Sequence, residues 1–239
     1  MKREKISVDF GHIVPVSTID WYKKSSCVVF FNKCPFRCAW CQNHNLLEQT
    51  NIVDINIVKN KIEESMDFVN SVIFSGGEPT LQEKALEALL RFSRRNDLLT
   101  GIQTNGYYNS TLKKVTEKGL VDMVFFDLKT SPSNTIKYES ITGMSDAYRN
   151  VFESFKIINM SRVSSEIRTT VFRSFIDDVF DIAKFLEEFN YRNTFVLQTG
   201  IPNNAPEGNI RNEKPIENRE LNNIAKKIAE ETGLTVTCR

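Results

Sequence analysis

The chain has 239 residues, of which 41% are hydrophobic and 26% are charged, and its formal net charge is +1. This length suits one large domain or two small ones, and the apolar content is sufficient for a sizeable core. Lys and Arg are dispersed among Asp and Glu, so the sequence offers no basic face of the kind that binds nucleic acid.

Neither a leader peptide nor a membrane segment is expected. Charged residues follow Met1 without an apolar stretch behind them, and no apolar run approaches the roughly 18–20 residues of a membrane span. The five cysteines are odd in number and three of them cluster, which is unlike a disulfide framework. We therefore expect a cytoplasmic protein.

The first third of the chain predicts a lead-in and two strand–helix units. Residues 1–24 read as the lead-in, with short extended pieces. A strand is expected over 26–32, because its continuous apolar run, 27–31, is typical of a strand buried on both faces of a parallel sheet. A helix is expected over 55–68, and a second apolar strand over 71–74.

A helix should follow that second strand. Thr80 and Glu83 have the spacing of a capping box, in which the first side chain accepts a hydrogen bond at the start of the helix. The alternation of strands and helices then continues along the chain. The elements expected are a strand over 99–106, a helix over 110–118, a strand over 123–129, a polar stretch over 130–145, a helix over 147–159, a strand over 166–172, a helix over 176–189, a strand over 194–198, a loop over 200–215, a helix over 217–231 and a short strand over 234–238.

Six strand–helix units in succession predict an α/β fold with a parallel sheet. Because eight units close a full barrel, we expect a partial (β/α)6 TIM-type barrel, with a doubly wound open sheet as the alternative. We expect a single domain over residues 1–239, in which 200–239 is a C-terminal extension. Both fold types bind ligands beyond the carboxyl ends of their strands.

Polar residues gather at these strand ends, where a shared sheet would bring them to one site. A zwitterionic ligand with an adenosine tail would suit them, because carbonyls and a carboxylate bind an ammonium group and Lys or Arg binds a carboxylate. An apolar, aromatic wall would suit the adenine. The residues are Cys34, Cys38, Cys41, Gly76, Gly77, Glu78, Gln103, Thr104, Asn105, Asp127, Lys129, Arg168 and Gln198.

Cys34, Cys38 and Cys41 follow the first buried strand, with three and then two residues between them. Thiolates at this spacing suit a soft metal, and iron–sulfur clusters are commonly held by four. Three would leave one iron for a ligand that is not protein, and an open metal position usually marks chemistry, as zinc sites show by analogy. The residues alone also allow a zinc knuckle completed by His44 or a distant cysteine, or an electron-transfer site.

The cysteine spacing, with Trp40 just before the last cysteine, resembles the signature of the radical S-adenosylmethionine (SAM) superfamily. The segment 75–79 is similar to the Gly-Gly-Glu-Pro motif of the same enzymes, which contacts the methionine amino group through backbone oxygens. The order of the two motifs along the chain makes the pair specific. The resemblance implies a [4Fe-4S] cluster whose fourth iron binds SAM, and reductive cleavage of SAM to methionine and a 5′-deoxyadenosyl radical. No catalytic side chain is expected beyond the cluster and SAM.

Further motifs resemble the activating enzymes of glycyl-radical enzymes. The segment 103–106 looks like their Asp-Thr-Asn-Gly turn, and 127–129 matches their Asp-Leu-Lys motif, whose Lys reaches the SAM carboxylate. Arg168 lies where these enzymes often have an Arg that contacts SAM. The segment 138–143 resembles a Tyr…Thr-Gly segment in one branch, the activating proteins of anaerobic ribonucleoside-triphosphate reductase, which are related to pyruvate formate-lyase activase.

The resemblance implies that the cluster is held by Cys34, Cys38 and Cys41. It implies a SAM site formed by Trp40 near the adenine, Gln42, Gly76, Gly77, Glu78, Gln103, Thr104, Asn105, Asp127, Lys129, Arg168 and Gln198. The partner would be a glycyl-radical enzyme, first of all anaerobic ribonucleotide reductase, and the electron donor a flavodoxin- or ferredoxin-type protein.

Other interpretations remain open at this point. A radical SAM enzyme could act on a small molecule instead, and a non-catalytic metal or electron-transfer protein is the more distant alternative. A solvated strand exit would explain 127–129, and a structural ion pair would explain Arg168.

Three features depart from the activase pattern. Gln103 replaces an Asp that helps to bind a monovalent cation beside SAM in pyruvate formate-lyase activase, so that cation is in doubt here. Gln42 replaces the His that is common after the third cysteine. The chain also lacks the length and the cysteines for an auxiliary-cluster domain, which favours a minimal activase.

Overall fold

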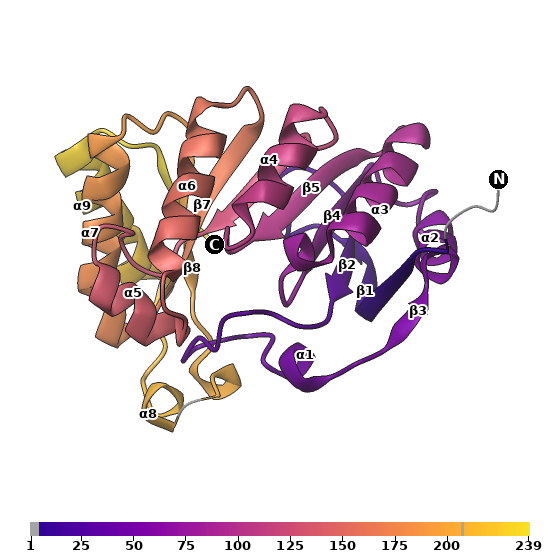
Figure 1. Cartoon of the computed structure of the whole chain (residues 1–239). Helices are drawn as coiled ribbons and strands as arrows, with labels where there is room; N and C mark the ends of the chain where they lie inside the picture. The colour runs from indigo at the N-terminus through magenta and orange to yellow at the C-terminus, as the bar shows by residue number, and fades with distance from the viewer. Residues whose placement is uncertain (1–4, 207) are drawn as a thin grey trace. The chain divides into compact units, whose positions relative to one another are not determined.

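A computed structural model describes residues 5–206 and 208–239. The chain divides into two compact units (Figure 1). Unit 1 comprises Met1–Cys34, Asn45–Thr104 and Tyr108–Val124, and unit 2 comprises Pro35–His44, Asn105–Tyr107 and Phe125–Arg239. The cysteine loop is therefore shared, with Cys34 in unit 1 and the other two clustered cysteines in unit 2.

Unit 1 is built on strands in the order β3-β1-β2-β4-β5. The strands β2, β4 and β5 are parallel, and β1 pairs antiparallel with β2 and β3. The apolar run of β4 is fully buried and that of β2 is buried except for the half-buried Phe30, close to what their sequences predict. The bounds are β1 Ser7–Ser17, β2 Ser26–Phe31, β3 Ile52–Asp54, β4 Ser71–Gly76 and β5 Leu99–Thr104.

In the described part of unit 1, helices and a 3-10 turn lie between these strands or follow the last of them. The bounds are α1 Asn45–Glu48, α2 Ile55–Glu63, the 3-10 turn Pro79–Gln82, α3 Glu83–Arg95 and α4 Asn109–Glu117. Two elements of unit 1, α1 and β3, had no sequence prediction. The lead-in forms one long strand rather than short pieces, because β1 has pairing partners on both sides.

The predicted capping box at Thr80 and Glu83 is wrong. Thr80 lies inside the 3-10 turn, and its hydroxyl donates to Glu78 Oε1 at 2.5 Å instead of accepting from a backbone N–H of α3. Gln82 is the residue that precedes α3, and its side chain makes no cap hydrogen bond. The Thr80 hydroxyl, which the sequence pattern assigns to helix capping, is therefore hydrogen-bonded to the carboxylate of Glu78, two residues upstream.

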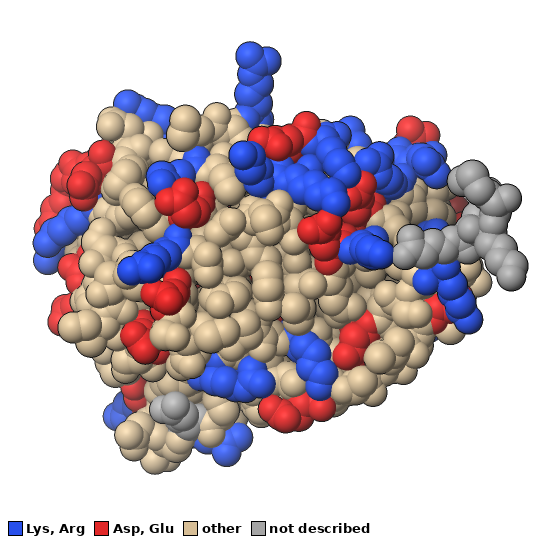
Figure 2. All heavy atoms as spheres, in the orientation of Figure 1, with Lys and Arg blue, Asp and Glu red and all other residues tan. Residues whose placement is uncertain are grey.

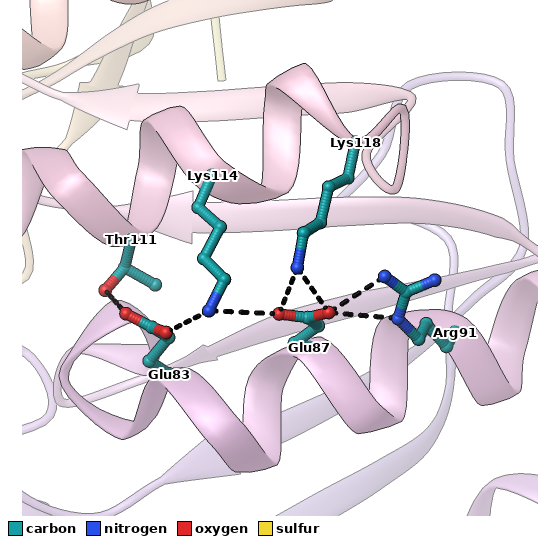
Figure 3. Close-up of polar contacts among 6 residues, drawn as sticks. All are labelled: Glu83, Glu87, Arg91, Thr111, Lys114 and Lys118. Atoms are coloured by element: carbon teal, nitrogen blue, oxygen red, sulfur yellow. Dashed lines mark hydrogen bonds and ion pairs between the residues drawn. The ribbon is translucent and has the colours of Figure 1, made fainter.

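An ion-pair network joins α3 to α4 in unit 1 (Figure 3). Glu87 accepts from Lys118 Nζ at 2.7 and 2.9 Å and from Arg91 at 2.9 and 3.0 Å, and Lys114 lies 3.4 Å away. Lys114 also pairs with Glu83. On the face shown in Figure 2, blue basic atoms and red acidic atoms lie side by side, in keeping with the small net charge.

This network should make part of the stability depend on pH. Hydrogen bonds from Lys118 are the main cause that lowers the pKa of Glu87 from 4.5 to about 2. Its contribution is fully present above about pH 4.5 and is lost as the pH falls towards 2. Because the partners are partly exposed, we expect Glu87→Gln to lower the free energy of unfolding by about 1 kcal/mol at pH 7, and by less near pH 2.

Urea denaturation of the variant at both pH values measures this effect. The control is Glu117→Gln, because Glu117 pairs only at 3.8 Å with Lys113 and both side chains are well exposed. An equal loss in the two variants at pH 7 would contradict the assignment of the stabilisation to Glu87.

Unit 2 has the strand order β6-β7-β8-β9, and β7, β8 and β9 run parallel. Leu197 and Val196 in the central strand β8 are fully buried. Gly233 ends the last helix in the left-handed conformation, with φ +71°, as its position in the sequence predicts. The bounds are β6 Met123–Asp127, of which Phe125–Asp127 belong to this unit, β7 Ser164–Val171, β8 Thr194–Thr199 and β9 Val236–Cys238.

The helices of unit 2 include two that the sequence left as loops. The first is α5 Thr135–Thr142, which the Asn134 side chain caps at its start and Gly143 ends with φ +65°. The second is the short α8 Gly208–Arg211, which follows a 3-10 turn at Pro202–Asn204. The others are α6 Ala147–Met160, the 3-10 turn Arg173–Phe175, α7 Ile176–Glu188 and α9 Asn218–Thr232.

Across the described parts of the chain, the helices lack the combination of length and apolar character that crossing a membrane requires.

Candidate functional site

The exit of β4 lies against the backbone that leads to the first cysteine. The N–H of Gly77 donates to the Phe31 carbonyl, and the N–H of Glu78 donates to the Lys33 carbonyl, both at 2.8 Å. A Cβ at Gly76 would lie 2.2 Å from Phe31 N, and one at Gly77 would lie 2.0 Å from Lys33 O. Only glycine allows this approach, and Gly76 also has a φ of +119°. The glycine pair thus fixes the chain segment that ends at Cys34.

Glu78 is fully buried and connects the ends of β4 and β5. Its Oε1 accepts from Thr80 N at 3.0 Å, from the Thr80 hydroxyl at 2.5 Å and from the Thr104 hydroxyl at 2.8 Å. Hydrogen bonds to a carboxylate are shorter and stronger than those between neutral groups. Glu78 therefore orders the backbone of the predicted SAM motif in unit 1.

Two of the predicted metal ligands, Cys38 and Cys41, lie in unit 2 near the half-buried Lys129. Burial raises the pKa of Cys38 to about 12 and raises that of Cys41, while the positive charge of Lys129 opposes both shifts. Within residues 5–206 and 208–239, no three His, Cys, Asp or Glu side chains come together as a set that could hold a metal ion. The donor chemistry fits an iron–sulfur cluster, because three cysteines follow one strand. The positive charge of Lys129 lies near two of them, Cys38 and Cys41.

Lys129 forms an ion pair with Asp127 at the end of β6. The two side chains are 13% and 24% exposed, and Asp127 raises the pKa of Lys129 against the opposing effect of burial. The Oδ2 atom of Asp127 accepts a hydrogen bond from Lys129 Nζ, whereas Oδ1 is buried and lacks a hydrogen-bond partner among the described residues. The pair is half-buried and internally paired, which differs from the fully solvated strand exit that the sequence left open.

Arg168 is 1% exposed and lies in an ion pair with Glu166, at 3.0 and 3.2 Å. Its guanidinium also covers the Phe125 ring, 3.8 Å from the centroid. Glu166 in turn binds Arg239 at 2.9 Å. The structural ion pair that the sequence left open is thus present, and contact between Arg168 and SAM stays a prediction.

Trp40 is buried in an apolar cluster of unit 2. Its ring centroid lies 4.3 Å from that of Phe175 and 6.0 Å from that of Phe172, and its Nε1 has no partner among the described residues. Gln42 Nε2 donates to the carbonyls of Trp40 at 3.1 Å and Ile201 at 3.4 Å. The cysteine loop is thereby tied to the segment after β8.

The remaining predicted residues have mainly local contacts. Gln103 accepts from the Ser75 hydroxyl at 2.9 Å in unit 1. In unit 2, Asn105 closes a turn with Tyr107 N at 3.0 Å, and Gln198 lies in β8 opposite Thr170. The structure therefore brings together one group in unit 1, Gly76, Gly77, Glu78, Gln103 and Thr104, and one in unit 2, Cys38, Cys41, Asp127 and Lys129.

Sequence reasoning missed two residues of this region. Glu166 stands two positions before Arg168, so a strand places both side chains on one face, and this spacing was a usable signal. Tyr138 belongs to a segment that the sequence noted only as a resemblance, and its burial depends on a helix that the sequence did not predict.

Comparison with known proteins places these features in a family. The model of the Radical SAM superfamily matches residues 28–204. A Methanocaldococcus jannaschii protein named "Putative glycyl-radical enzyme activating enzyme MJ1227" is 29% identical over 90% of each chain. The pyruvate formate-lyase 1-activating enzyme of Escherichia coli K12 is 26% identical over 68% of this chain and 67% of its own.

The fold is also found among solved structures. SuiB of Streptococcus suis, bound to the precursor peptide SuiA, superimposes with a TM-score of 0.70 and 18% identity, over 89% of this chain and 48% of that one. This chain thus spans about half the length of SuiB, and the likeness concerns the fold alone. It confirms the predicted α/β partial barrel with a mostly parallel sheet and alternating helices. The chain belongs to the radical SAM superfamily, whose cofactors are a [4Fe-4S] cluster and SAM.

Proposed function

We propose that this chain activates a glycyl-radical enzyme by reductive cleavage of SAM at a [4Fe-4S] cluster. The observation that carries the proposal is the half-buried Lys129–Asp127 pair beside Cys38 and Cys41, with the unpartnered oxygen of Asp127. A cation and a spare acceptor next to two thiols match a ligand that has a carboxylate and an amino group and approaches a metal centre.

Cys34, Cys38 and Cys41 would hold the cluster, and metal binding would remove their protons despite the raised pKa values. When bound, the reduced cluster and SAM supply a carbon-centred radical able to abstract hydrogen. The protein's own residues would bind and orient SAM. Lys129 would face the SAM carboxylate, while the Gly76–Gly77 backbone would present its carbonyls to the methionine end. Trp40 and its aromatic neighbours would exclude water from the adenine side.

A glycine Cα of a partner protein would be the hydrogen source. The names of two relatives, which match over most of their length, support a protein substrate of this kind. The segment 138–143 favours anaerobic ribonucleotide reductase over pyruvate formate-lyase as the partner. A flavodoxin- or ferredoxin-type protein would supply the electron.

Electron paramagnetic resonance tests the proposal. Cluster-loaded protein, dithionite and SAM would be mixed under anaerobic conditions with anaerobic ribonucleotide reductase or with pyruvate formate-lyase from the same organism. We expect a glycyl-radical signal with the reductase. A signal with pyruvate formate-lyase alone would reassign the partner, and release of 5′-deoxyadenosine without a radical on either protein would point to a small-molecule substrate.

A further inference from the structure

Helix α5 holds its buried face against the cysteine loop of unit 2. That face consists of Tyr138, Ile141 and Thr142. The backbone N–H of Arg37 donates to the Thr142 carbonyl at 2.8 Å, and Ile141 belongs to the same apolar cluster as Trp40. The helix is therefore anchored directly to the loop that carries Cys38 and Cys41, and it fixes the position of Tyr138.

Tyr138 is fully buried, and its hydroxyl proton has no acceptor among the described residues. Burial is the main cause that raises the pKa of this phenol well above its usual value; the charges of Asp127 and Cys38 add to the shift, and the charge and the backbone of Lys129 oppose it. The phenol is thus neutral and keeps a proton to donate. Its neighbours are the groups that the proposed function assigns to cofactor binding.

Two buried polar atoms in the electrostatic neighbourhood of Lys129 therefore have unused hydrogen-bonding capacity. The Tyr138 hydroxyl is a donor without an acceptor, and Asp127 Oδ1 is an acceptor without a donor. Buried polar groups are almost always hydrogen-bonded, because leaving them unpaired is costly. Tyr191 shows the ordinary arrangement, since it is also buried but its hydroxyl lies 3.1 Å from Ser165 Oγ. Tyr138 and Asp127 can therefore each offer a hydrogen bond to a ligand that binds at Lys129.

We propose that the Tyr138 hydroxyl is a further SAM-binding group, which donates a hydrogen bond to the carboxylate at the amino-acid end of SAM. Lys129 faces the same carboxylate, and Asp127 Oδ1 accepts from an N–H of the same end. This inference rests on the proposed function, because it takes the ligand of the cluster to be SAM. Tyr138 binds and orients, and no atom of its side chain takes part in bond cleavage.

The test is Tyr138→Phe in cluster-loaded protein, which removes only the hydroxyl. Anaerobic calorimetry would measure the dissociation constant of SAM, and a thermal melt without SAM would measure stability. We expect SAM to bind about tenfold more weakly, as for the loss of one hydrogen bond. We expect the melting temperature without SAM to stay the same or rise, because the variant removes an unpaired buried group.

The matched control is Tyr191→Phe, which removes a buried hydroxyl that has a partner. We expect the opposite pattern, a lower melting temperature with unchanged SAM binding. Tyr138→Phe would overturn the inference if it bound SAM as wild type does. A shifted cluster reduction potential in SAM-free protein, with unchanged SAM binding, would also overturn it, since the hydroxyl would then serve Cys38. Wild-type protein that fails to bind SAM would instead refute the proposed function.

Discussion

Replacing Cys34, Cys38 or Cys41 with alanine, one at a time, is expected to abolish the release of 5′-deoxyadenosine. Each variant loses one of three thiolates that we assign to the cluster, and no other cysteine follows the same strand. Changes in the second shell of a metal site already cost about 10–100-fold in metal affinity or activity, so losing a ligand should cost more than about 100-fold. Iron content and product yield after anaerobic reconstitution measure the effect.

The other two cysteines provide the controls. Cys238 lies in the terminal strand β9 and is half-buried, so Cys238→Ser should retain full iron content and activity. Cys27 is fully buried in β2, and burial raises the pKa of its thiol to about 11, as expected for a core residue. Cys27→Ala should lower stability but keep the cluster. Loss of the cluster in Cys238→Ser, with Cys41→Ala intact, would contradict the ligand assignment.

Gly76→Ala is expected to destabilise the protein by about 3 kcal/mol. The new Cβ would lie 2.2 Å from the backbone nitrogen of Phe31, which has no room to move, and the residue would keep a φ of +119°. Overpacking of this kind costs about 1–3 kcal/mol, and a left-handed conformation adds about 1–2 kcal/mol. Urea denaturation of the variant measures the loss.

Two other glycines separate the contact from the backbone strain. Gly119 has a φ of +62° and open space around it, so Gly119→Ala should cost only about 1 kcal/mol. Gly208 also has open space and an ordinary φ, so Gly208→Ala should be nearly neutral or slightly stabilising. Equal losses at Gly76 and Gly119 would show that the approach to Phe31 contributes nothing.

The sequence predicted the fold and the site motifs where local pattern and tertiary role coincide. Buried runs such as Val72–Phe74 identify parallel strands, because both faces of such strands are covered. Gly76 and Gly77 could be recognised as part of a SAM motif, whereas only the structure shows that they approach the backbone of Phe31 and Lys33.

Other features depend on contacts that a local pattern does not contain. Helix α5 lacks a clear apolar stripe and forms because its ends are capped and Tyr138 and Ile141 find burial in unit 2. Thr80 fits a capping pattern, but its hydroxyl hydrogen-bonds the carboxylate of Glu78 instead of capping α3. The sequence allowed a structural ion pair for Arg168, and only the structure identifies Glu166 on the same strand as its partner.

Deuterium transfer tests whether the hydrogen abstracted during activation comes from a glycine Cα of the partner protein. A partner glycyl-radical enzyme labelled with deuterium at its glycine Cα positions would be mixed with cluster-loaded protein, reductant and SAM. Mass spectrometry would then measure the deuterium content of the 5′-deoxyadenosine formed. The account predicts one deuterium in each molecule formed during activation. Product without deuterium, formed in the presence of the labelled partner, would contradict it.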